Sequence, residues 1–474
     1  MKRITRRAFL RYSALAGLSL AGSQFPVKIH AAPDSDTILV IIMLAGGPDM
    51  RYLIVPPYES SSGTYGNAFW TARARTYGIS PDNAEALAAK WEEYHHLESS
   101  GTIFGIHARC GWLRDQFVAG NVAIISNVFI SRNRDHAHSR LRLEQGDMDA
   151  ATSDQGRSGW GGRLAKICGK NICSLTSSVR QVCYGPHPTN PADHDNSNVI
   201  DAKDTRNMGL YEYDSDYPDG NSWRWNTRGI MSRALTSYYA AKARSLSTDS
   251  PYYRIIQHEQ SVRSFGRQVN ARLDSVPVPE AIEALYTSDS GNQLDSSGFA
   301  YQVRNIYDVL ACEDILETNI LSADYDGWDN HRYMQENIEP HLEDILGTNK
   351  GLDVLHAQLN ANQPGKAERL VFLLYGEFGR QLAANGDHGT DHGEGNYCLL
   401  IGSRINGGIY GEMFPTSEIP RFSQPGEDIE GKTSYERVFA RLCDAIKSGS
   451  SDSVIPGWQE TELEPGVDLS GLIS

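Results

Sequence analysis

Short continuous apolar runs mark the buried elements of this chain of 474 residues. Ile38–Leu44 reads ILVIIML, and similar runs occupy residues 122–128, Leu370–Tyr375 and residues 398–401. Strands of parallel sheets are buried on both faces, so they appear as unbroken apolar runs rather than as alternating patterns. The four runs therefore predict strands of a mainly parallel sheet.

Longer stretches with helix-like patterning separate these runs, at residues 231–246, 253–273, 299–316, 337–346 and Tyr435–Ile446. Strands that alternate with helices predict an α/β fold, with a mainly parallel sheet flanked by helices on both faces. We expect one domain over residues 33–474, because large α/β enzymes reach this size as a single domain. Residues 175–228 are rich in Pro, Asn, Asp and Gly, which predicts a loop-rich insertion.

The N-terminus has the layout of an export signal. Arg6 and Arg7 precede a weakly apolar run at residues 13–21, and small residues follow at positions 31 and 32. Paired arginines before such a run predict a twin-arginine signal peptide over residues 1–32, recognised by the twin-arginine translocase. The alternative is an N-terminal amphipathic helix that stays on the domain. The signal predicts a periplasmic or secreted protein.

The charge of the chain limits its possible partners, and its cysteines limit its possible disulfide bonds. The formal net charge is −15, and residues 1–32 hold six basic and no acidic residues, so the remainder carries −21. This acidity argues against nucleic acid and anionic membranes as partners, and no later segment is long and apolar enough to span a membrane. Seven cysteines without a C-x-x-C pair argue against a disulfide framework, leaving at most one bridge among Cys168, Cys173 and Cys183.

Two segments contain candidate metal ligands. One follows the first predicted strand, and the other precedes a predicted helix. Asp49 comes after Gly46 and Gly47 at the end of the first apolar run. Parallel sheets bind their ligands at such strand ends. The alternative is that Gly-Gly-Pro-Asp forms an ordinary turn without a ligand. Asp329 and His331 lie two residues apart before a helical stretch. Oxygen and nitrogen ligands suit zinc, manganese or iron better than calcium. The alternative is a helix cap at Asp329 with an exposed His331.

A third segment concentrates potential ligands more strongly. Asp387-His388 and Asp391-His392 stand among glycines between the runs 370–375 and 398–401. Glycines permit sharp turns, so both pairs can face one ion or two neighbouring ions, and we favour this interpretation over a plain loop.

The fourth segment, residues 131–140, mixes hydroxyl, imidazole and guanidinium groups. A hydroxyl beside a metal can act as a nucleophile, and arginines such as Arg140 can grip a phosphate or sulfate. A charged helix start in contact with solvent is an equal alternative.

Five motifs in one order give the chain a family resemblance. They are the glycine-rich turn at 44–49, GWGGRL at 159–164, WDNH at 328–331, EFGR at 377–380 and GTDHG at 389–393. The chain resembles the twin-arginine-exported bacterial proteins grouped as domain of unknown function 1501, relatives of the alkaline phosphatase and sulfatase superfamily. The resemblance implies an alkaline-phosphatase-like fold and one or two divalent metals. The ligands that it implies are Asp49, Asp329, His331, Asp391 and His392.

Two departures from the family pattern affect the expected chemistry. No histidine follows His392, so His388 or His136 would have to complete a second metal site. Asp135 stands where the family usually has a serine, so Ser139, Ser131 or a water molecule would replace that nucleophile, or Asp135 itself would act as a general base. Non-bridging oxygens of the ester would be bound by Arg380 or Arg140.

These observations lead to two hypotheses for function. The first is an exported metal-dependent hydrolase that acts on phosphate or sulfate esters of a small molecule or polysaccharide. The second is a non-catalytic envelope or polysaccharide-binding protein that retains the hydrolase fold, as the Asp135 departure suggests. The retained set of Asp and His residues favours the first.

We predict that replacing both Arg6 and Arg7 by Lys blocks export, because the paired guanidinium groups are the feature that the translocase recognises. Cell fractionation and immunoblotting would locate the variant in the cytoplasm, beside a periplasmic marker as control. Normal export of the Lys–Lys variant would contradict the twin-arginine prediction.

Overall fold

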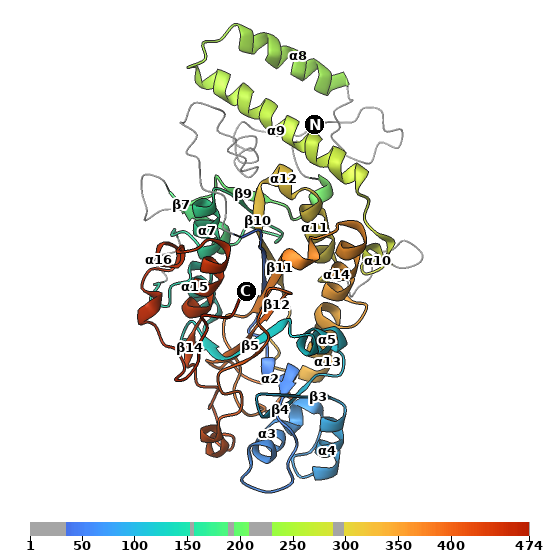
Figure 1. The fold of residues 1–474 in the computed structure, drawn as a ribbon, viewed down its shortest axis with the longest axis vertical. Coiled ribbons are helices and arrows are strands. Elements are labelled where there is room, and N and C mark those ends of the chain that lie inside the picture. Colours follow the sequence, from blue (N-terminus) through green and yellow to red (C-terminus); the bar gives the residue numbers. More distant parts are fainter. Residues whose placement is uncertain (1–34, 152–155, 188–193, 208–229, 288–297, 474) are drawn as a thin grey trace.

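The computed structural model describes residues 35–151, 156–187, 194–207, 230–287 and 298–473. The predicted signal peptide and parts of the predicted insertion lie outside the described residues. A nine-stranded sheet forms the centre of the molecule, in the order β13-β5-β12-β11-β1-β10-β6-β9, with β14 paired to β5 (Figure 1). Its strands are β1 (Ile38–Leu44), β5 (Val122–Phe129), β6 (Asn171–Ser174), β9 (Val199–Asp201), β10 (Thr318–Tyr325), β11 (Leu370–Tyr375), β12 (Asn396–Ile401), β13 (Gly408–Tyr410) and β14 (Thr433–Ser434).

The sheet is mainly parallel, as predicted. β1 pairs in parallel with β10 on one side and with β11 on the other. Only β12 runs against its two neighbours in the described part of this sheet, since it is antiparallel to both β11 and β5. The carboxyl ends of β1, β5, β10 and β11 therefore all meet at one edge.

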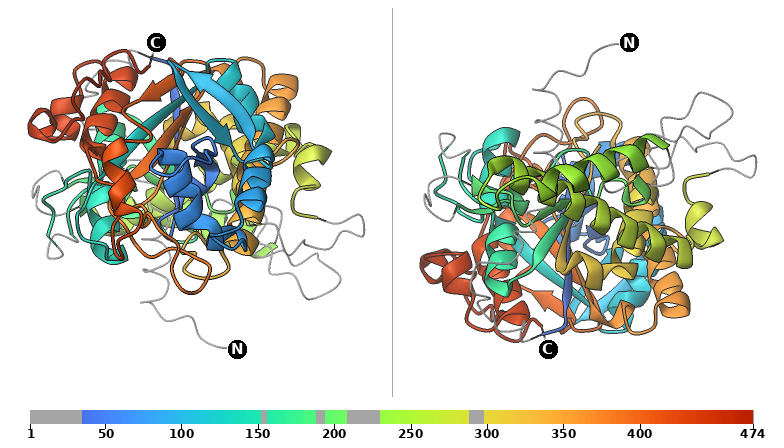
Figure 2. Two further views of the ribbon diagram at one scale, coloured as in Figure 1. Left: turned by 90° about the horizontal axis from the view of Figure 1, so that it is seen from below. Right: turned by 90° about the horizontal axis from the view of Figure 1, so that it is seen from above.

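Helices cover both faces of the sheet, so β1 contributes to two separate cores (Figure 2). Ile38, Val40 and Ile42 pack on one face, and Leu39 and Ile41 pack on the other. The first face is covered by α5 (Gly111–Val118), α11 (Ala300–Ala311), α13 (Met334–Leu346) and α14 (Gly351–Asn362). The second is covered by α6 (His136–Gln145), α7 (Trp160–Cys168), α15 (Tyr435–Ile446) and α16 (Ser451–Val454).

The remaining elements lie at the two ends of the sheet. At one end, β2 (Ile54–Val55), β3 (His95–Ser99) and β4 (Thr102–Ile106) form a small sheet beside α2 (Met50–Leu53), α3 (Tyr65–Arg73) and α4 (Ala84–Glu92) (Figure 1). At the other end lie α8 (Ile230–Arg244), α9 (Pro251–Ser275) and α12 (Glu313–Leu316), whereas α10 (Glu280–Glu283) lies beside α11 and α14. No described helix has the length and apolarity needed to cross a membrane.

The four predicted strands and five predicted helical stretches all form, but the central strand β10 was missed. The described part of segment 175–228 contains a strand, β9, that pairs with β6 at the sheet edge. It also holds a short hairpin of β7 (Gly185–Pro186) and β8 (His194–Asp195). All seven cysteines are buried and none of them is in a disulfide in the structure, so the bridge that was left open is not seen.

A buried carboxylate joins α13 to the small sheet. Glu339 is 6% exposed, and its oxygens lie 3.0 Å from Tyr52 Oη, 3.5 Å from Lys90 Nζ and 3.4 Å from His107 Nε2. Arg109 Nε lies 3.2 Å from its second oxygen. Burial alone raises the pKa of Glu339, but the hydrogen bond and charge of His107, together with Lys90, lower that pKa to about 2.

We predict that Glu339→Gln removes an acid-sensitive part of the stability. Because the folded pKa lies below the unfolded value, the carboxylate stabilises the fold above about pH 4.5 and loses this effect as the pH falls toward 2. The variant should lose on the order of 3 kcal/mol at pH 7 and show a flatter decline in stability between pH 5 and pH 2. Urea unfolding at several pH values measures both effects.

Glu343→Gln is the matched control, because Glu343 lies on the same helix but is 40% exposed. It should change the free energy of unfolding by no more than about 1 kcal/mol. Equal behaviour of the two variants would contradict the role assigned to Glu339.

Candidate functional site

The sequence-predicted motifs meet at the carboxyl edge of the central sheet. Residues 45–49 follow β1, residues 326–333 follow β10 and residues 376–395 follow β11. The segment 130–135 leaves β5 at the same edge and leads into α6. Ligands of open α/β sheets bind at such edges, because the loops converge there.

Three potential metal ligands from three of these segments converge. One ligating atom each of His136, Asp329 and His392 lies within 4.8 Å of the other two. His136 Nε2 is 3.5 Å from Asp329 Oδ2, and His392 Nε2 is 3.1 Å from Asp329 Oδ1. His331 adds a fourth donor, with Nε2 3.1 Å from Asp329 Oδ1 and 2.9 Å from His392 Nε2. We call these four residues the donor group.

Carboxylates anchor two of the imidazoles through their other ring nitrogen. His136 Nδ1 donates to Glu377 Oε1 over 2.9 Å, and His331 Nδ1 donates to Asp391 Oδ1 over 3.0 Å. A carboxylate can only accept here, so each hydrogen bond fixes the proton on Nδ1 and leaves a lone pair on Nε2 when the ring is neutral. Asp391, which was predicted as a direct metal ligand, thus lies behind His331 and outside the group of mutually close ligand atoms.

The third imidazole is anchored by the backbone. His392 Nδ1 lies 2.9 Å from the carbonyl oxygen of Arg134 and donates to it. All three imidazoles thus turn Nε2 toward Asp329. This is the outer-sphere arrangement that commonly orients metal-binding histidines in proteins.

The donor group is open to solvent and carries shifted pKa values. The side chains of Asp329, His331 and His136 are 42%, 38% and 35% exposed, so small molecules and ions can reach them. Burial raises the pKa of Asp329, but the Arg380 guanidinium outweighs it and holds that pKa below its usual value. The hydrogen bond to Glu377 raises the pKa of His136, and burial lowers the pKa of His392.

Arg380 was predicted to bind ester oxygens, and the structure contradicts this role. Its side chain is 1% exposed, and its guanidinium donates only to groups of the protein itself. Nε donates to the Gly47 carbonyl over 2.7 Å, and Nη2 donates to Asp329 Oδ1 over 2.7 Å. The other acceptors are the carbonyl oxygens of Gly46, Trp328 and Thr390. Arg380 ties three loops of the site together and has no face left for a substrate.

Asp49 does not join the donor group. Its carboxylate is 3% exposed, forms an ion pair with Arg73 and accepts a hydrogen bond from Thr390 Oγ1 over 3.1 Å. Arg73 is itself fully buried beside it. The structure therefore gives Asp49 a neutralising partner from the protein where the resemblance implied a metal ion.

The predicted nucleophile positions are all engaged elsewhere. Asp135 is exposed and caps α6, accepting from the backbone N–H of His138 over 2.9 Å. Ser139 is fully buried and donates to the Asn133 carbonyl over 2.6 Å. Ser131 is 2% exposed, and its Oγ accepts from the backbone N–H of Asn133 over 3.0 Å. Asp135 is thus a helix cap, as the alternative interpretation of this segment had it.

His388 also lies outside the donor group. It has a positive φ of 63°, and its Nδ1 lies 3.0 Å from the backbone oxygen of Arg75. Its backbone forms an isolated bridge with Arg332, which holds the loop 385–392 against the segment after β10. The structure therefore does not place His388 as the substitute for a missing ligand.

Glu377 is the functional candidate that the sequence interpretation missed. Its side chain is fully buried, and Oε1 accepts from His136, from the Gly46 backbone N–H over 3.0 Å and from Arg140 Nη2 over 3.3 Å. Oε2 has no partner among the described residues. Glu377 follows the buried strand β11 within two residues, the same kind of position that singled out Asp49, so the strand-end rule was sufficient to find it.

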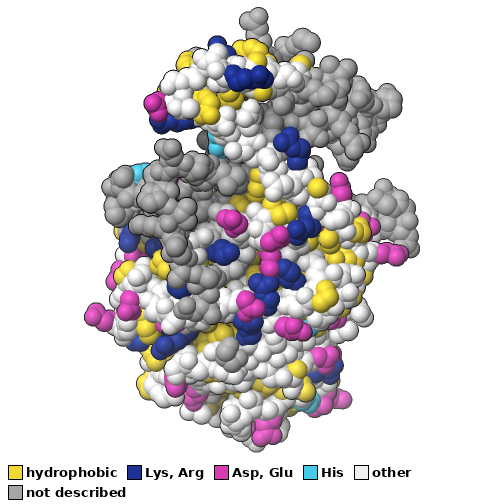
Figure 3. Space-filling view, turned by 45° about the horizontal axis from the view of Figure 1, so that its top comes forward, with side chains coloured by type: hydrophobic (Ala, Val, Ile, Leu, Met, Phe, Trp, Pro, Cys, Tyr) yellow, Lys and Arg dark blue, Asp and Glu magenta, His cyan; other side chains and the backbone are white. Residues whose placement is uncertain are grey.

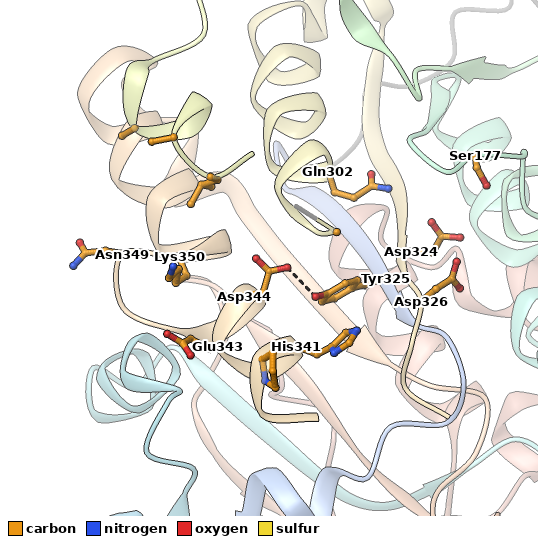
Figure 4. A pocket seen from close by; sticks show the side chains of 15 residues that line it. Ser177, Gln302, Asp324, Tyr325, Asp326, His341, Glu343, Asp344, Asn349 and Lys350 are labelled. Atoms are coloured by element: carbon orange, nitrogen blue, oxygen red, sulfur yellow. Dashed lines mark hydrogen bonds between the residues drawn. The ribbon is translucent and has the colours of Figure 1, made fainter. Parts of the chain in front are cut away.

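A cavity of about 710 Å³ lies between the carboxyl end of β10 and α13, among other lining segments (Figure 4). Asp324, Tyr325 and Asp326 line it, and Tyr325 donates a hydrogen bond to Asp344 over 2.8 Å. Its lining, taken from the described residues, includes no member of the donor group. This cavity and the converging donors are therefore two separate features of the described structure.

Several solved structures of hydrolases are similar to this chain at low TM-score. They include the phosphonate monoester hydrolase SpPMH from Silicibacter pomeroyi, at 9% identity and TM-score 0.29 over 87% of this chain and 73% of that chain. The putative sulfatase yidJ from Bacteroides fragilis matches at 11% identity and TM-score 0.31, over 93% and 79% of the two chains. Alkaline phosphatase from Thermus thermophilus matches at 11% identity and TM-score 0.25, over 94% and 80%.

Likenesses at TM-scores this low carry no information about the chemistry of this chain. No curated protein matches its sequence. The segment that holds the WDNH, EFGR and GTDHG motifs gives the firmest comparison. Residues 233–420 match the family model described as protein of unknown function (DUF1501), which confirms the family resemblance that the motifs indicate.

Proposed function

We propose that this chain is an exported, metal-dependent hydrolase of phosphate or sulfate esters. The observation that supports the proposal is the convergence of three imidazole Nε2 atoms on the carboxylate of Asp329, within 3.1–3.5 Å of its oxygens. When the rings are neutral, three lone pairs and a negative charge face one another across this space. Such an arrangement is unfavourable without a cation or a shared proton, and it suits a bound metal ion.

The donor group fits the divalent metals that the resemblance implies. Three imidazole nitrogens and one carboxylate form a nitrogen-rich set, which zinc, manganese or iron accept and calcium does not favour. Ligands at about 2.1 Å from one tetrahedral ion lie about 3.4 Å from each other. The distances from Asp329 to each of the three imidazoles, and from His331 to His392, are 2.9–3.5 Å and close to this value. Ligand atoms of His136, Asp329 and His392 all lie within 4.8 Å of one another.

One metal site fits this chain better than two. Asp49 is neutralised by Arg73, and Asp391 is hydrogen-bonded to His331 and Asn385. Each of the two carboxylates therefore already has a partner in the protein. We infer that His136, Asp329 and His392 would hold a single ion, with His331 next to Asp329 and His392.

The protein's own residues prepare the site for an anionic ester. Glu377 and Asp391 hold two imidazoles in fixed orientations, and Arg380 keeps Asp329 ionised and in place. Arg140 is 33% exposed and contacts Glu377 at the same edge, so it is a cation that could bind non-bridging oxygens. A bound divalent ion would neutralise charge on the transferred group and lower the pKa of a water molecule.

Water is the nucleophile that fits the geometry. Ser131 and Ser139 are buried and hydrogen-bonded, and Asp135 caps a helix. Attack by water needs no covalent intermediate on the protein, so the absence of the family's serine does not by itself remove activity. The proposal of periplasmic or secreted location rests on the twin-arginine pattern at Arg6 and Arg7.

The second candidate function is a non-catalytic envelope or polysaccharide-binding protein. Two observations favour it: the Asp49 carboxylate is paired with Arg73, and Asp135 occupies the serine position. Metal binding without turnover of any ester would support this candidate. Turnover that depends on the metal would favour the hydrolase.

We predict that His392→Ala lowers the content of bound divalent metal to about a tenth or less, because it removes one donor from a four-residue set. The side chain lies at an open edge, so the melting temperature of the metal-free protein should shift by no more than about 3 °C. Elemental analysis and thermal unfolding before and after chelation measure both quantities. Chelation should lower the melting temperature of the parent more than that of the variant, since bound metal stabilises the folded state.

The matched control is His388→Ala, which removes an imidazole from the same loop without touching the donor group. It should retain the parent's metal content. A parent protein without metal, or equal losses in the two variants, would contradict the assignment.

We predict that Asp135→Ser leaves both stability and ester turnover within about twofold of the parent. Serine is a good helix cap, so the bond to the His138 backbone N–H can be kept, and the side chain at position 135 is exposed. Assays with generic phosphate and sulfate esters, beside Asp135→Ala as the variant without a cap, test this. A clear rise in turnover would show instead that position 135 carries the family's nucleophile.

A further inference from the structure

The helical hairpin formed by α8 and α9 stands at the end of the sheet opposite the donor group (Figure 1). Phe265, Val269 and Leu273, in the second half of α9, belong to the main hydrophobic core. The first half of α9 runs beyond this anchor and packs against α8. At 1.5 Å per residue, the stretch from Pro251 to Val262 carries the tip about 18 Å along the helix axis from the anchored part.

The tip of the hairpin exposes large hydrophobic side chains. Tyr238, Tyr252 and Ile255 are 60%, 64% and 54% exposed. The other large hydrophobic side chains that stand out in this way in the described part are Ile103, Val118 and Tyr333. Three of these six exposed hydrophobic residues therefore lie in one 18-residue stretch of the hairpin, residues 238–255. Exposed apolar side chains that cluster in this way commonly mark an interaction surface.

The same tip is basic, in contrast to the rest of the chain. Lys242, Arg244 and Arg254 are exposed, and Asp249 is the only acidic residue between positions 238 and 255. The whole chain has a formal net charge of −15. Figure 3 shows Lys and Arg atoms beside hydrophobic atoms on the hairpin at the top of the view. The tip therefore combines cations with tyrosines on one protruding element.

We propose that the tip of the α8–α9 hairpin binds the surface of an anionic lipid bilayer. Tyrosine rings settle at the boundary between headgroups and acyl chains, and each nearby Lys or Arg adds attraction to anionic lipids. A protruding tip suits this partner, because lipid headgroups adapt around a convex shape. A specific protein partner needs about 800 Å² of complementary surface, which a narrow hairpin tip does not offer by itself.

The net negative charge of the whole chain predicts repulsion from anionic membranes, which conflicts with the proposal. The distance of the tip from the rest of the chain removes this conflict. Electrostatic forces are screened over about 10 Å at moderate salt, so a tip about 18 Å from the anchored part of α9 responds mainly to its own charges. Binding would also orient the molecule. The donor group at the opposite edge of the sheet would face away from the lipid, so the proposal does not depend on catalysis at that group.

Vesicle co-sedimentation tests the proposal. The probes are vesicles of phosphatidylcholine alone and vesicles with about 30% phosphatidylglycerol. The parent chain should pellet with the anionic vesicles at least about fivefold more than with the neutral ones, and about 0.5 M NaCl should abolish the difference. Every variant is prepared in the same form of the chain, so that the basic N-terminal segment contributes equally to each.

Two sets of tip variants separate charge from apolar contact. Lys242→Glu with Arg244→Glu and Arg254→Glu should lower binding to anionic vesicles at least about tenfold. Tyr238→Ser with Tyr252→Ser and Ile255→Ser should weaken binding at both salt concentrations. The matched controls lie on the body: Arg75→Glu, Lys203→Glu and Lys350→Glu for charge, and Ile103→Ser with Val118→Ser for exposed apolar side chains.

A fluorophore at the tip gives an independent readout. The native cysteines are all buried, so Tyr238→Cys can be labelled selectively with an environment-sensitive dye. Its emission should rise on addition of anionic vesicles, while the same dye at Val118→Cys should not respond. Unchanged emission at position 238, or tip variants that bind like the parent, would overturn the proposal. Self-association that the tip variants abolish, without vesicle binding, would assign the surface to a second copy of the chain.

Discussion

The geometry of the candidate site depends on one buried guanidinium. Arg380 is 1% exposed and bonds to three loops that are far apart in the sequence, through Gly46, Gly47, Trp328, Asp329 and Thr390. Burying a charge of this kind is unfavourable unless its N–H groups are satisfied and a counter-charge is near. Four backbone carbonyls meet the first requirement, and the carboxylate of Asp329 meets the second. The loops are therefore held by a residue that the solvent never reaches.

Asp329 contacts both Arg380 and the three imidazoles. Its Oδ1 accepts from Arg380 and also lies 3.1 Å from both His331 Nε2 and His392 Nε2, while Oδ2 faces His136. A carboxylate that is already paired with a guanidinium offers less negative charge to a metal ion than a free carboxylate does. Three imidazoles around it compensate for this with lone pairs. The proposed metal site would therefore suit a borderline metal such as zinc, which accepts neutral nitrogen ligands, better than calcium.

Features that depend on local sequence could be predicted, and features that depend on contacts between distant residues could not. Strands β1 and β11 were predicted, because unbroken apolar runs report burial on both faces directly. β10 was missed, since Thr318–Tyr325 includes Asn319, Ser322 and Asp324 and becomes a strand through pairing with its neighbours on both sides. Within the site, the structure brings the motif residues His392 and Asp329 together at one edge of the sheet. The pairing of Asp49 with Arg73 and the burial of Arg380 arise from tertiary contacts, which the spacing of residues in the sequence does not predict.

The hydrogen bonds around the imidazoles distinguish a site kept for use from a remnant of the fold. Glu377, Asp391 and the Arg134 carbonyl each fix a proton on one ring nitrogen, which forces the opposite lone pairs of three histidines toward one carboxylate. A fold under no functional constraint would be more stable if these rings turned outward, where water could solvate Nε2. Proteins retain locally unfavourable electrostatics where they serve binding or chemistry. A bound cation, or a proton shared between His331 and His392, would relieve the crowding of donors around Asp329, and this crowding is the basis of the proposed metal site.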